Sequence, residues 1–320
     1  MKVFVTGGTG FLGGRVIARL KKEGHEITAL ARGESGVRTL KEAGATTVSG
    51  TFTNISEWEK SLHGMDAIVH CAAPVVFWGK WSDFKRDMVQ ATVDLHAAGD
   101  RQGVKRFIHI SSESVLQDKG PLLDIDETHP YPTEPNSIYG RAKKETEIAL
   151  LAQDSSSIRI ILRPTFIWGR GEKALDSMIA KIRSGEFMWI DQGRETIEMV
   201  HVENVVEAIV LALSKGSDKD IYFVTDDNPM PAREFFTRLF ATRGVEAPTK
   251  NIGGGLARLG AGIVEGIWKL FGIRNPPPLS RFEVAFVSQP RRYNIARIKN
   301  GLGYKPVVDF KTGLETLVSG

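Results

Sequence analysis

The sequence predicts an α/β fold organised around a doubly wound parallel sheet. Short β-branched runs alternate with longer helical patterns through the first half of the chain, which is typical of βαβ units. A glycine-rich turn joins the first predicted strand to the first predicted helix. The 320 residues are more than one ordinary core needs, so we also expect a smaller α+β domain.

Each predicted strand of the first half is a short apolar run bounded by turn residues or charges, at 2–6, 26–31, 46–49, 67–70, 106–111 and 158–162. Apolar residues at helical spacing predict the helices between them, at 10–22, 35–43, 83–101 and 137–151. Right-handed crossovers through such units place a ligand crevice at the carboxyl ends of the strands.

The predicted domains are discontinuous along the chain. Residues 1–164 form the first domain and 196–222 return to it, while 165–195 and 223–320 form the substrate domain. A further helix is predicted over 252–273, with an apolar face made of Leu256, Leu259, Ile263, Ile267 and Leu270. Its charged residues argue against a membrane span. Three alternatives stay open: packing on its own domain, lying on a membrane surface, or covering the substrate as a lid.

Composition excludes several classes of protein. The single cysteine, Cys71, rules out an intramolecular disulfide, and we expect a reducing, cytoplasmic location. The net charge of +4 arises from residues 271–320, which contain eight basic and three acidic residues. A uniformly basic nucleic-acid-binding protein is therefore not expected. This basic region is expected either to be solvated or to attract an anionic substrate tail or membrane surface. No spacing of His, Asp or Glu predicts a metal site.

The glycine turn predicts a dinucleotide site of the Rossmann type. Gly7 and Gly10 permit a tight turn, and the following helix offers unpaired N–H groups to a pyrophosphate. We therefore expect cofactor contacts from Gly7, Thr9, Gly10, Phe11 and Leu12. An NAD site usually has an acidic residue at the end of the second strand, where this chain has Ala31 and Arg32. A guanidinium suits a 2′-phosphate, so we predict NADP rather than NAD, the alternative being a solvated arginine.

Tyr139 and Lys143 are four residues apart in a predicted helix and therefore share a face. A neighbouring ammonium favours the phenolate and makes a tyrosine a workable proton donor or acceptor. Ser111 and Ser112 follow a predicted strand, where a hydroxyl can stabilise charge on a substrate oxygen.

Glycine turn, serine and Tyr-x-x-x-Lys, in this order, resemble the extended short-chain dehydrogenases/reductases of the epimerase/dehydratase family across nearly the whole chain. The resemblance implies that Tyr139 is the general acid/base and that Lys143 lowers its pKa while binding the nicotinamide ribose. It also implies that Ser112 orients the substrate oxygen, because the family's catalytic hydroxyl stands three residues before a valine, here Val115. Ser111 is the second choice.

The resemblance extends to further cofactor contacts. Ala72 and Ala73 follow the fourth predicted strand, where small residues let the cofactor pass closely. Thr51 and Phe52 stand where the family often has an aspartate at the adenine, and Pro164 ends the sixth predicted strand. These five residues complete the predicted cofactor site.

Several departures from the family pattern bear on the substrate. Glu113 and Ser114 replace the Asp-Glu pair of dehydratases, and Met88 replaces a common asparagine. Nucleotide-sugar enzymes of the family tend to have an asparagine where this chain has Phe166 and an arginine where it has Ile197. Both of those polar residues bind the diphosphate of the sugar nucleotide. An apolar ketone or alcohol therefore fits better than a sugar nucleotide.

Aromatic residues in loops that follow strands are expected to line an apolar pocket, with core packing as the alternative: Phe77, Trp78, Trp81 and Trp168. His201 is expected to pack or cap a helix rather than to act as a base. The C-terminal segments at 277–282, 292–297 and 301–306 resemble the 3β-hydroxysteroid dehydrogenase family and related bacterial β-keto reductases.

We therefore predict an NADP(H)-dependent oxidoreductase that transfers hydride between nicotinamide and a hydrophobic secondary alcohol or ketone, steroid-like or β-keto and long-chain. The alternatives are a nucleotide-sugar epimerase and, from another class, a non-catalytic NAD(P)-sensing protein. The expected partner is the small carbonyl or alcohol substrate, and the resemblance adds a homodimer as an option. No nucleic acid and no transmembrane span are expected.

Overall fold

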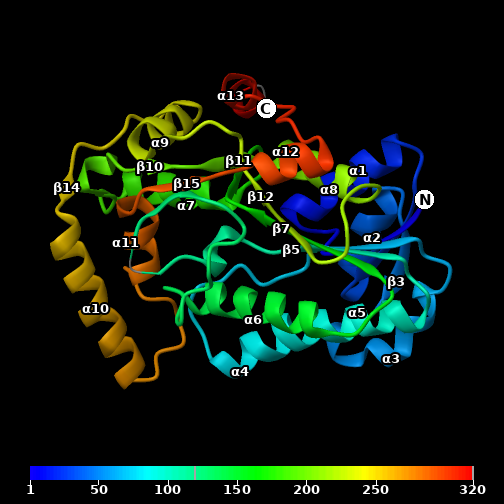
Figure 1. Cartoon of the computed structure of the whole chain (residues 1–320). Helices are drawn as coiled ribbons and strands as arrows, with labels where there is room; N and C mark the ends of the chain where they lie inside the picture. The colour runs from blue at the N-terminus through cyan, green and yellow to red at the C-terminus, as the bar shows by residue number, and fades with distance from the viewer. Residues whose placement is uncertain (119, 319–320) are drawn as a thin grey trace.

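A seven-stranded parallel sheet forms the centre of the computed structural model, which describes residues 1–118 and 120–318 (Figure 1). The strand order is β12, β7, β5, β4, β1, β2, β3. All six predicted strands are confirmed, as β1 (Lys2–Thr6), β2 (Glu26–Ala31), β3 (Thr46–Ser49), β4 (Ala67–His70), β5 (Arg106–Ile110) and β7 (Ile158–Pro164). The seventh strand, β12 (Asp220–Val224), was not predicted and pairs with β7 at the edge.

Helices cover both faces of the sheet (Figure 1). Successive residues of a strand point to opposite faces, so Val3 and Val5 lie in one core and Phe4 in the other. The core on one face includes α1 (Phe11–Lys22), α2 (Gly33–Glu42), α8 (Val202–Ala212) and α12 (Ala296–Leu302). The core on the other face includes α3 (Ile55–Trp58), α5 (Ala91–Arg101) and α6 (Ile138–Ala152). This is the doubly wound fold that the sequence predicts.

The helical stretch predicted at 83–101 is confirmed, but it begins two residues earlier and contains a π-helical turn. The segment begins as α4 (Trp81–Phe84), continues as a π-helical turn (Lys85–Gln90) and only then becomes α5. The wider turn leaves both Met88 and Val89 buried, although they are consecutive. Met88 thereby packs in one cluster with Tyr139, which fits the frequent occurrence of π turns at functional sites.

The remaining elements form a smaller α+β layer beside the sheet (Figure 1). Its helices are α7 (Lys173–Arg183), α9 (Ala232–Ala241), α10 (Gly254–Leu270), α11 (Arg281–Ser288) and α13 (Phe310–Val318). Its short strands pair as β8 (Phe166–Trp168) with β11 (Met199–His201), β9 (Trp189–Ile190) with β14 (Asn251–Ile252), and β10 (Thr196–Ile197) with β13 (Met230–Pro231). A fourth pair, β6 (Leu122–Ile125) with β15 (Arg291–Tyr293), joins two distant segments.

Trp168 lies in the core of this smaller layer, as the alternative of core packing predicted. Its ring is fully buried and makes edge contacts with the rings of His201, Phe235 and Phe310. The prediction that His201 caps or packs is confirmed, because its Nδ1 accepts the N–H of Glu203 at the start of α8.

Two segments that the prediction assigned to the substrate domain pack on the large sheet or its helices. The predicted boundary after residue 222 falls inside β12, so residues 223–224 belong to the sheet. Farther along, α12 contacts both β12 and α8, and Ile298 and Leu302 join the same core as α1. Domain boundaries that assign these two segments to the first domain therefore agree better with the packing than the predicted boundaries do.

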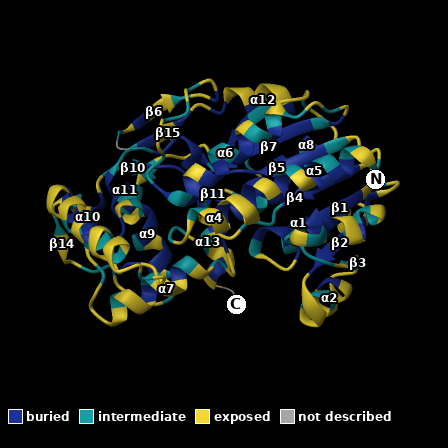
Figure 2. Ribbon diagram, turned by 90° about the horizontal axis from the view of Figure 1, so that it is seen from below, coloured by how far each residue is buried: buried dark blue, intermediate teal, exposed yellow. Residues whose placement is uncertain are grey.

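The helix predicted within 252–273 forms as α10, but its apolar stripe faces away from the protein. Leu256, Leu259, Ile263, Ile267 and Leu270 are all exposed, and the small residues Ala257 and Ala261 are buried instead. Figure 2 shows α10 at the edge of the molecule with much of its surface exposed. Of the three alternatives, packing of the helix on its own domain is therefore confirmed, but through Ala257 and Ala261 and not through the expected apolar stripe. No helix within residues 1–118 and 120–318 is long and apolar enough to cross a membrane.

Most of the basic C-terminal charge is neutralised locally. Five of the eight basic residues of 271–320 lie in ion pairs with acids from other segments, namely Arg281–Glu265, Arg291–Glu113, Arg292–Asp124, Arg297–Asp220 and Lys299–Asp227. These pairs attach the C-terminal region to the rest of the chain, so it presents no continuous basic face.

Glu198 is a buried acid whose titration should affect folding stability. It accepts the N–H of Tyr293 at 3.2 Å and is only 4% exposed, and burial raises its pKa from 4.5 to about 7. Because the folded state holds this proton more tightly than the unfolded state, the group's contribution to stability is complete below pH 4.5 and is lost as the pH rises through 7.

Replacing Glu198 by glutamine should remove this dependence. We expect Glu198→Gln and the unmodified protein to unfold at similar urea concentrations at pH 5, whereas at pH 8 the variant should be more stable by on the order of 3 kcal/mol. Glu246→Gln, at an exposed position, is the control. A stability difference for Glu198→Gln that is the same at both pH values would contradict the assignment.

Candidate active site

The glycine turn forms a cradle between β1 and α1 that only glycine fits. Gly7 has a φ of +71°, and a Cβ there would lie 2.8 Å from the backbone nitrogen of Ala72. A Cβ on Gly13 would lie 2.2 Å from the carbonyl oxygen of Gly7. Gly10 begins α1, and no side chain caps the free N–H groups of the first turn. Close backbone approach and uncapped donors together fit a pyrophosphate.

The other predicted residues of the turn contribute in different ways. Thr9 is exposed and Phe11 is half-buried, with the guanidinium of Arg15 lying 4.6 Å from its ring centre. Leu12 packs its side chain into the core, so only its backbone faces the turn. Ala72 and the neighbouring Ala73 lie just after β4, and the backbone of Ala72 lies against Gly7.

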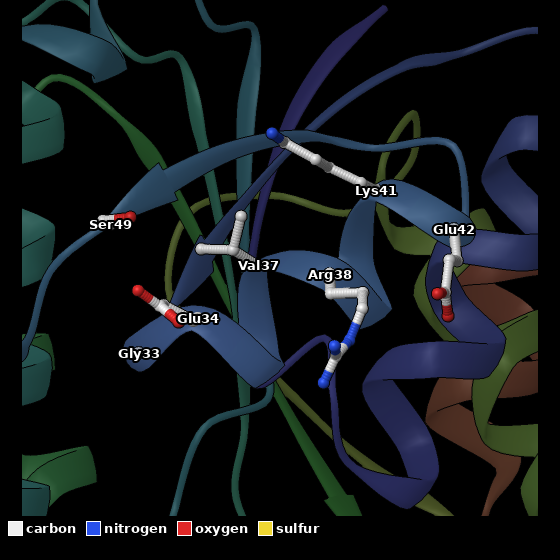
Figure 3. Close-up of a pocket in the computed structure, with 7 residues that line it drawn as sticks. All are labelled: Gly33, Glu34, Val37, Arg38, Lys41, Glu42 and Ser49. Atoms are coloured by element: carbon white, nitrogen blue, oxygen red, sulfur yellow. The ribbon is translucent and has the colours of Figure 1, made fainter.

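Arg32 lies at the end of β2, where it precedes α2 and is exposed. A surface hollow of about 520 Å³ begins beside it and follows α2 towards Ser49 of β3 (Figure 3). The charged residues that line the hollow have both signs. The full lining is Gly33, Glu34, Val37, Arg38, Lys41, Glu42 and Ser49. None of the predicted catalytic residues lines this hollow, which lies at the far edge of the sheet from α6.

Thr51 and Phe52 are engaged in local contacts after β3. The Thr51 hydroxyl donates to Asn54 Oδ1 at 2.7 Å, and the Thr51 carbonyl accepts Trp58 Nε1–H at 2.9 Å. The Phe52 ring makes an edge contact with His70 of β4. Pro164, at the end of β7, is buried and pairs with β12.

Ser112 and Lys143 approach each other at the end of β5. Lys143 Nζ donates to the carbonyl oxygen of Ile110 at 2.6 Å, two residues before Ser112. The start of α6 approaches the 3₁₀ turn Glu113–Val115 so closely that a Cβ on Gly140 would lie 2.5 Å from the Ser114 carbonyl oxygen. This contact brings the start of α6, which carries Tyr139, to the strand end that carries Ser112.

Of the two serines, Ser112 has the more accessible hydroxyl. It is half-buried, and its Oγ accepts the N–H of Ser114 at 3.2 Å. Ser111 is 3% exposed, and its buried Oγ has no hydrogen-bond partner. This difference favours Ser112 over Ser111 as the group that meets a substrate oxygen.

Burial controls the proton affinity of both Tyr139 and Lys143. It raises the pKa of Tyr139 well above its ordinary value, which is opposite to the direction expected from a neighbouring ammonium. It lowers the pKa of Lys143 to about 8, and Lys143 Nζ lies 5.9 Å from the centre of the Tyr139 ring. At neutral pH the phenol therefore holds its proton while Lys143 stays mostly cationic, which suits a proton donor.

A buried ion pair beneath Lys143 was missed by the sequence analysis. Glu147 lies one helical turn after Lys143 and receives Arg163 Nη2–H at 2.7 Å and the hydroxyl of Tyr131 at 2.6 Å. The Glu147 carboxylate favours the ammonium form of Lys143 and so partly offsets its burial. The spacing of four from Tyr139 to Lys143 to Glu147 was the available signal, because it places all three on one helix face.

An aromatic wall stands beside Tyr139. Phe77 meets the Tyr139 ring edge-on at 5.3 Å and stacks on Phe282 of α11 at 4.0 Å. The neighbouring Trp78 donates its Nε1–H to the carbonyl oxygen of Ile273 at 3.0 Å. The prediction that Phe77 reaches the pocket is consistent with this position, whereas the part played by Phe282 was not foreseen.

The groups that a dehydratase or a sugar-diphosphate site would need are engaged or absent. Glu113 is buried and hydrogen-bonded to Tyr293 and Gln117, so it is not free to move protons. Phe166 packs among aromatic rings, and Ile197 is fully buried. Neither Phe166 nor Ile197 therefore offers a polar anchor for a diphosphate.

The fold and this arrangement define a dinucleotide-binding enzyme that acts on an alcohol or carbonyl group. The model of the NAD dependent epimerase/dehydratase family matches residues 3–224, and the chain belongs to this family. It is an NAD(P)-dependent enzyme of the short-chain dehydrogenase/reductase type.

Three relatives match nearly the whole chain. A 4-hydroxy-2-methyl-3-oxo-4-farnesyl-3,4-dihydroquinoline-1-oxide ketoreductase from Stigmatella aurantiaca is 33% identical over 99% of this chain and 96% of its own length. A 2-alkyl-3-oxoalkanoate reductase from Stenotrophomonas maltophilia is 30% identical over 99% and 98%. A 3-beta-hydroxysteroid dehydrogenase from Mycolicibacterium neoaurum is 28% identical over 96% and 87%.

Solved structures agree in fold. The UDP-glucose 4-epimerase of Thermotoga maritima has a TM-score of 0.75 and 22% identity, covering 99% of this chain and 97% of that one. At this identity the likeness concerns the arrangement of the chain.

Proposed function

We propose that the protein is an NADPH-dependent ketoreductase for an apolar ketone, with Tyr139 as the proton donor. The observation that carries the proposal is the position of the Tyr139 ring, which meets Phe77 edge-on at 5.3 Å and lies 5.9 Å from Lys143 Nζ. Relatives are named for a farnesylated quinoline, an alkyl oxoalkanoate and a steroid, each of which has a large hydrocarbon portion, and this supports the substrate class.

Ser112, Tyr139 and Lys143 have different roles in the proposed carbonyl reduction. Ser112 donates a hydrogen bond to the carbonyl oxygen, and Tyr139 transfers its phenolic proton to that oxygen as the carbonyl carbon is reduced. Lys143 stabilises the phenolate that is left, which regains a proton from solvent. The glycine cradle and Lys143 would hold NADPH, and the bound cofactor would supply the hydride. In the direction of alcohol oxidation, the same groups act in reverse.

A screen of NADPH oxidation with steroid, β-keto acyl and aryl ketones tests the function. We expect turnover with at least one long or polycyclic apolar ketone and none with UDP-glucose. Binding of UDP-sugars with no ketone turnover would instead support the epimerase alternative.

The preference for NADPH over NADH depends on Arg32, which is exposed at the end of β2. A hydrogen bond from a guanidinium to a 2′-phosphate contributes about 1.5–3 kcal/mol, so Arg32→Ala should lower kcat/KM for NADPH by roughly 10- to 100-fold. The value for NADH should change little, because NADH has a hydroxyl at that position. Lys41→Ala, which removes a cation from the far end of α2, is the matched control. Equal losses with both cofactors would contradict the assignment.

A further inference from the structure

Glu113 is a buried acid that directly follows Ser112, and three other side chains hold its carboxylate. It accepts the hydroxyl of Tyr293 and, at 2.7 Å, the Nε2–H of Gln117. The Nε of Arg291 lies 3.8 Å from the same carboxylate oxygen. The side chains of Glu113 and Arg291 are 5% and 2% exposed, so solvent screens this pair little. A buried charge is costly unless it is paired and hydrogen-bonded, and the Glu113 carboxylate is both.

Two of these partners come from the C-terminal part of the chain. Arg291 and Tyr293 are the two ends of β15, and Tyr293 follows Glu113 by 180 positions. Pairing with β6 fixes β15 in turn, and so does the Tyr293 N–H, which donates to Glu198 at 3.2 Å. Arg291 also donates its Nη2–H to the carbonyl oxygen of Phe286 at 2.6 Å. The Glu113 carboxylate is therefore attached to a strand that has its own fixed contacts.

The turn that follows Ser112 is short and holds itself weakly. It is the 3₁₀ turn Glu113–Val115, whose backbone hydrogen bonds are 3.1–3.3 Å long. Val115 is fully buried in the core and anchors the far end of the turn. Before the turn, the N–H of Ser111 donates to a carbonyl oxygen of β7 at 2.7 Å. Ser112 thus lies between Ser111 and Glu113, and the side chain of Glu113 supplies the anchor on the turn side.

The Tyr293 hydroxyl keeps its proton and therefore remains a donor to Glu113. Burial and the Glu113 carboxylate both raise the pKa of Tyr293 well above its ordinary value. The ring of Tyr293 lies in the core, with its centre 4.5 Å from that of Phe223. Because phenylalanine keeps this packing and removes only the hydroxyl, Tyr293→Phe weakens the hold on Glu113 with little other change.

We propose that Glu113, held by Arg291 and Tyr293, is a positioning residue that orients the Ser112 hydroxyl towards the substrate oxygen. The inference rests on the proposed function, in which Ser112 donates a hydrogen bond to that oxygen. Such a donor stabilises the transition state only from the correct position, and a displacement of about 1 Å costs up to about 10²-fold in rate. The C-terminal strand β15 thereby contributes to the active site through Glu113.

Hydrogen exchange of the whole protein, followed by mass spectrometry, tests the positioning without any measurement of turnover. In Tyr293→Phe the backbone amides of residues 111–117 should exchange on the order of tenfold faster, because the turn has lost one hydrogen bond to a charged group. Tyr222→Phe is the matched control, since the Tyr222 hydroxyl also donates to a carboxylate, that of Asp220 at 2.7 Å, and Tyr222 is only 2% exposed. Unchanged exchange over 111–117 in Tyr293→Phe would overturn the proposal, whatever the substrate is.

A double-mutant cycle tests whether the effect on catalysis passes through Ser112. Tyr293→Phe should lower kcat for ketone reduction about tenfold with NADPH binding unchanged, whereas Tyr222→Phe should not lower it. Ser112→Ala should lower kcat by about 10²- to 10³-fold, and adding Tyr293→Phe to it should cause no further loss.

The outcomes of the cycle separate this proposal from the proposed function. A further tenfold loss in the double variant would overturn the proposal, because a merely structural defect acts whether or not Ser112 is present. A normal loss in Ser112→Ala with none in Tyr293→Phe would also overturn it and leave the proposed function intact. Unchanged kcat in Ser112→Ala would contradict the role of Ser112 in the proposed function, and this proposal with it.

Discussion

Replacing Tyr139 by phenylalanine is expected to lower kcat for ketone reduction by roughly 10²- to 10⁴-fold, the usual contribution of a general acid. In the proposed mechanism the phenol protonates the substrate oxygen, because Ser112 can donate a hydrogen bond but holds its proton far too tightly to transfer it. The ring of Tyr139 packs against Phe77 and Met88, and phenylalanine keeps this packing. The loss should therefore appear in kcat, with NADPH binding nearly unchanged.

The control for Tyr139→Phe is a second buried tyrosine whose hydroxyl has no role in the proposed reaction. Tyr304 is 1% exposed, and its hydroxyl donates at 2.9 Å to the carbonyl oxygen of Thr225, which follows β12, two strands away from β5 and Ser112. Tyr304→Phe should cost some stability and leave kcat close to that of the unmodified protein. Steady-state kinetics and NADPH titration of both variants decide the matter: if Tyr139→Phe turns over normally, another proton donor must be sought.

The central sheet and the glycine turn were predictable because local patterns determine them. Strands buried on both faces are continuous apolar runs, and the one missed strand, β12, forms the edge of the sheet. Gly7 and Gly13 have no room for a side chain because a strand, a tight turn and a helix follow one another directly in the chain. This local arrangement was likewise predictable.

What could not be predicted depends on contacts between distant segments. Phe282 reaches the active site only because α11 packs beside the loop that carries Phe77, 205 positions earlier in the chain. The apolar stripe of α10 has the periodicity of a core face, yet the small residues beside it are the ones that pack. Periodicity shows that a helix has an apolar face, but it does not show what covers that face.

Replacing Arg163 by methionine is expected to destabilise the protein by about 3–5 kcal/mol, because it leaves the Glu147 carboxylate buried without a counter-ion. Both side chains are almost inaccessible, at 1% and 0% exposed, and their closest atoms are 2.7 Å apart. A loss of this size is a large part of the stability of a typical domain, so Arg163→Met should unfold at a much lower urea concentration.

A compensating change separates the lost pairing from lost packing. Arg163→Met/Glu147→Met removes both charges and should recover much of the stability lost by Arg163→Met alone. The matched control is the exposed pair of Arg238 and Glu234 on α9, where Arg238→Met should cost less than about 1 kcal/mol. If the double variant is no more stable than Arg163→Met, the unpaired carboxylate is not the cause.

The same pair links stability to the active site through Lys143. Since Glu147 favours the ammonium form of Lys143, whose pKa is about 8, removing the carboxylate should lower that pKa further. In Glu147→Gln the decline of kcat on the alkaline side should therefore begin at a lower pH than in the unmodified protein. A purely structural role for Glu147 would lower stability and leave the position of this decline unchanged, so the pH profile of kcat distinguishes the two.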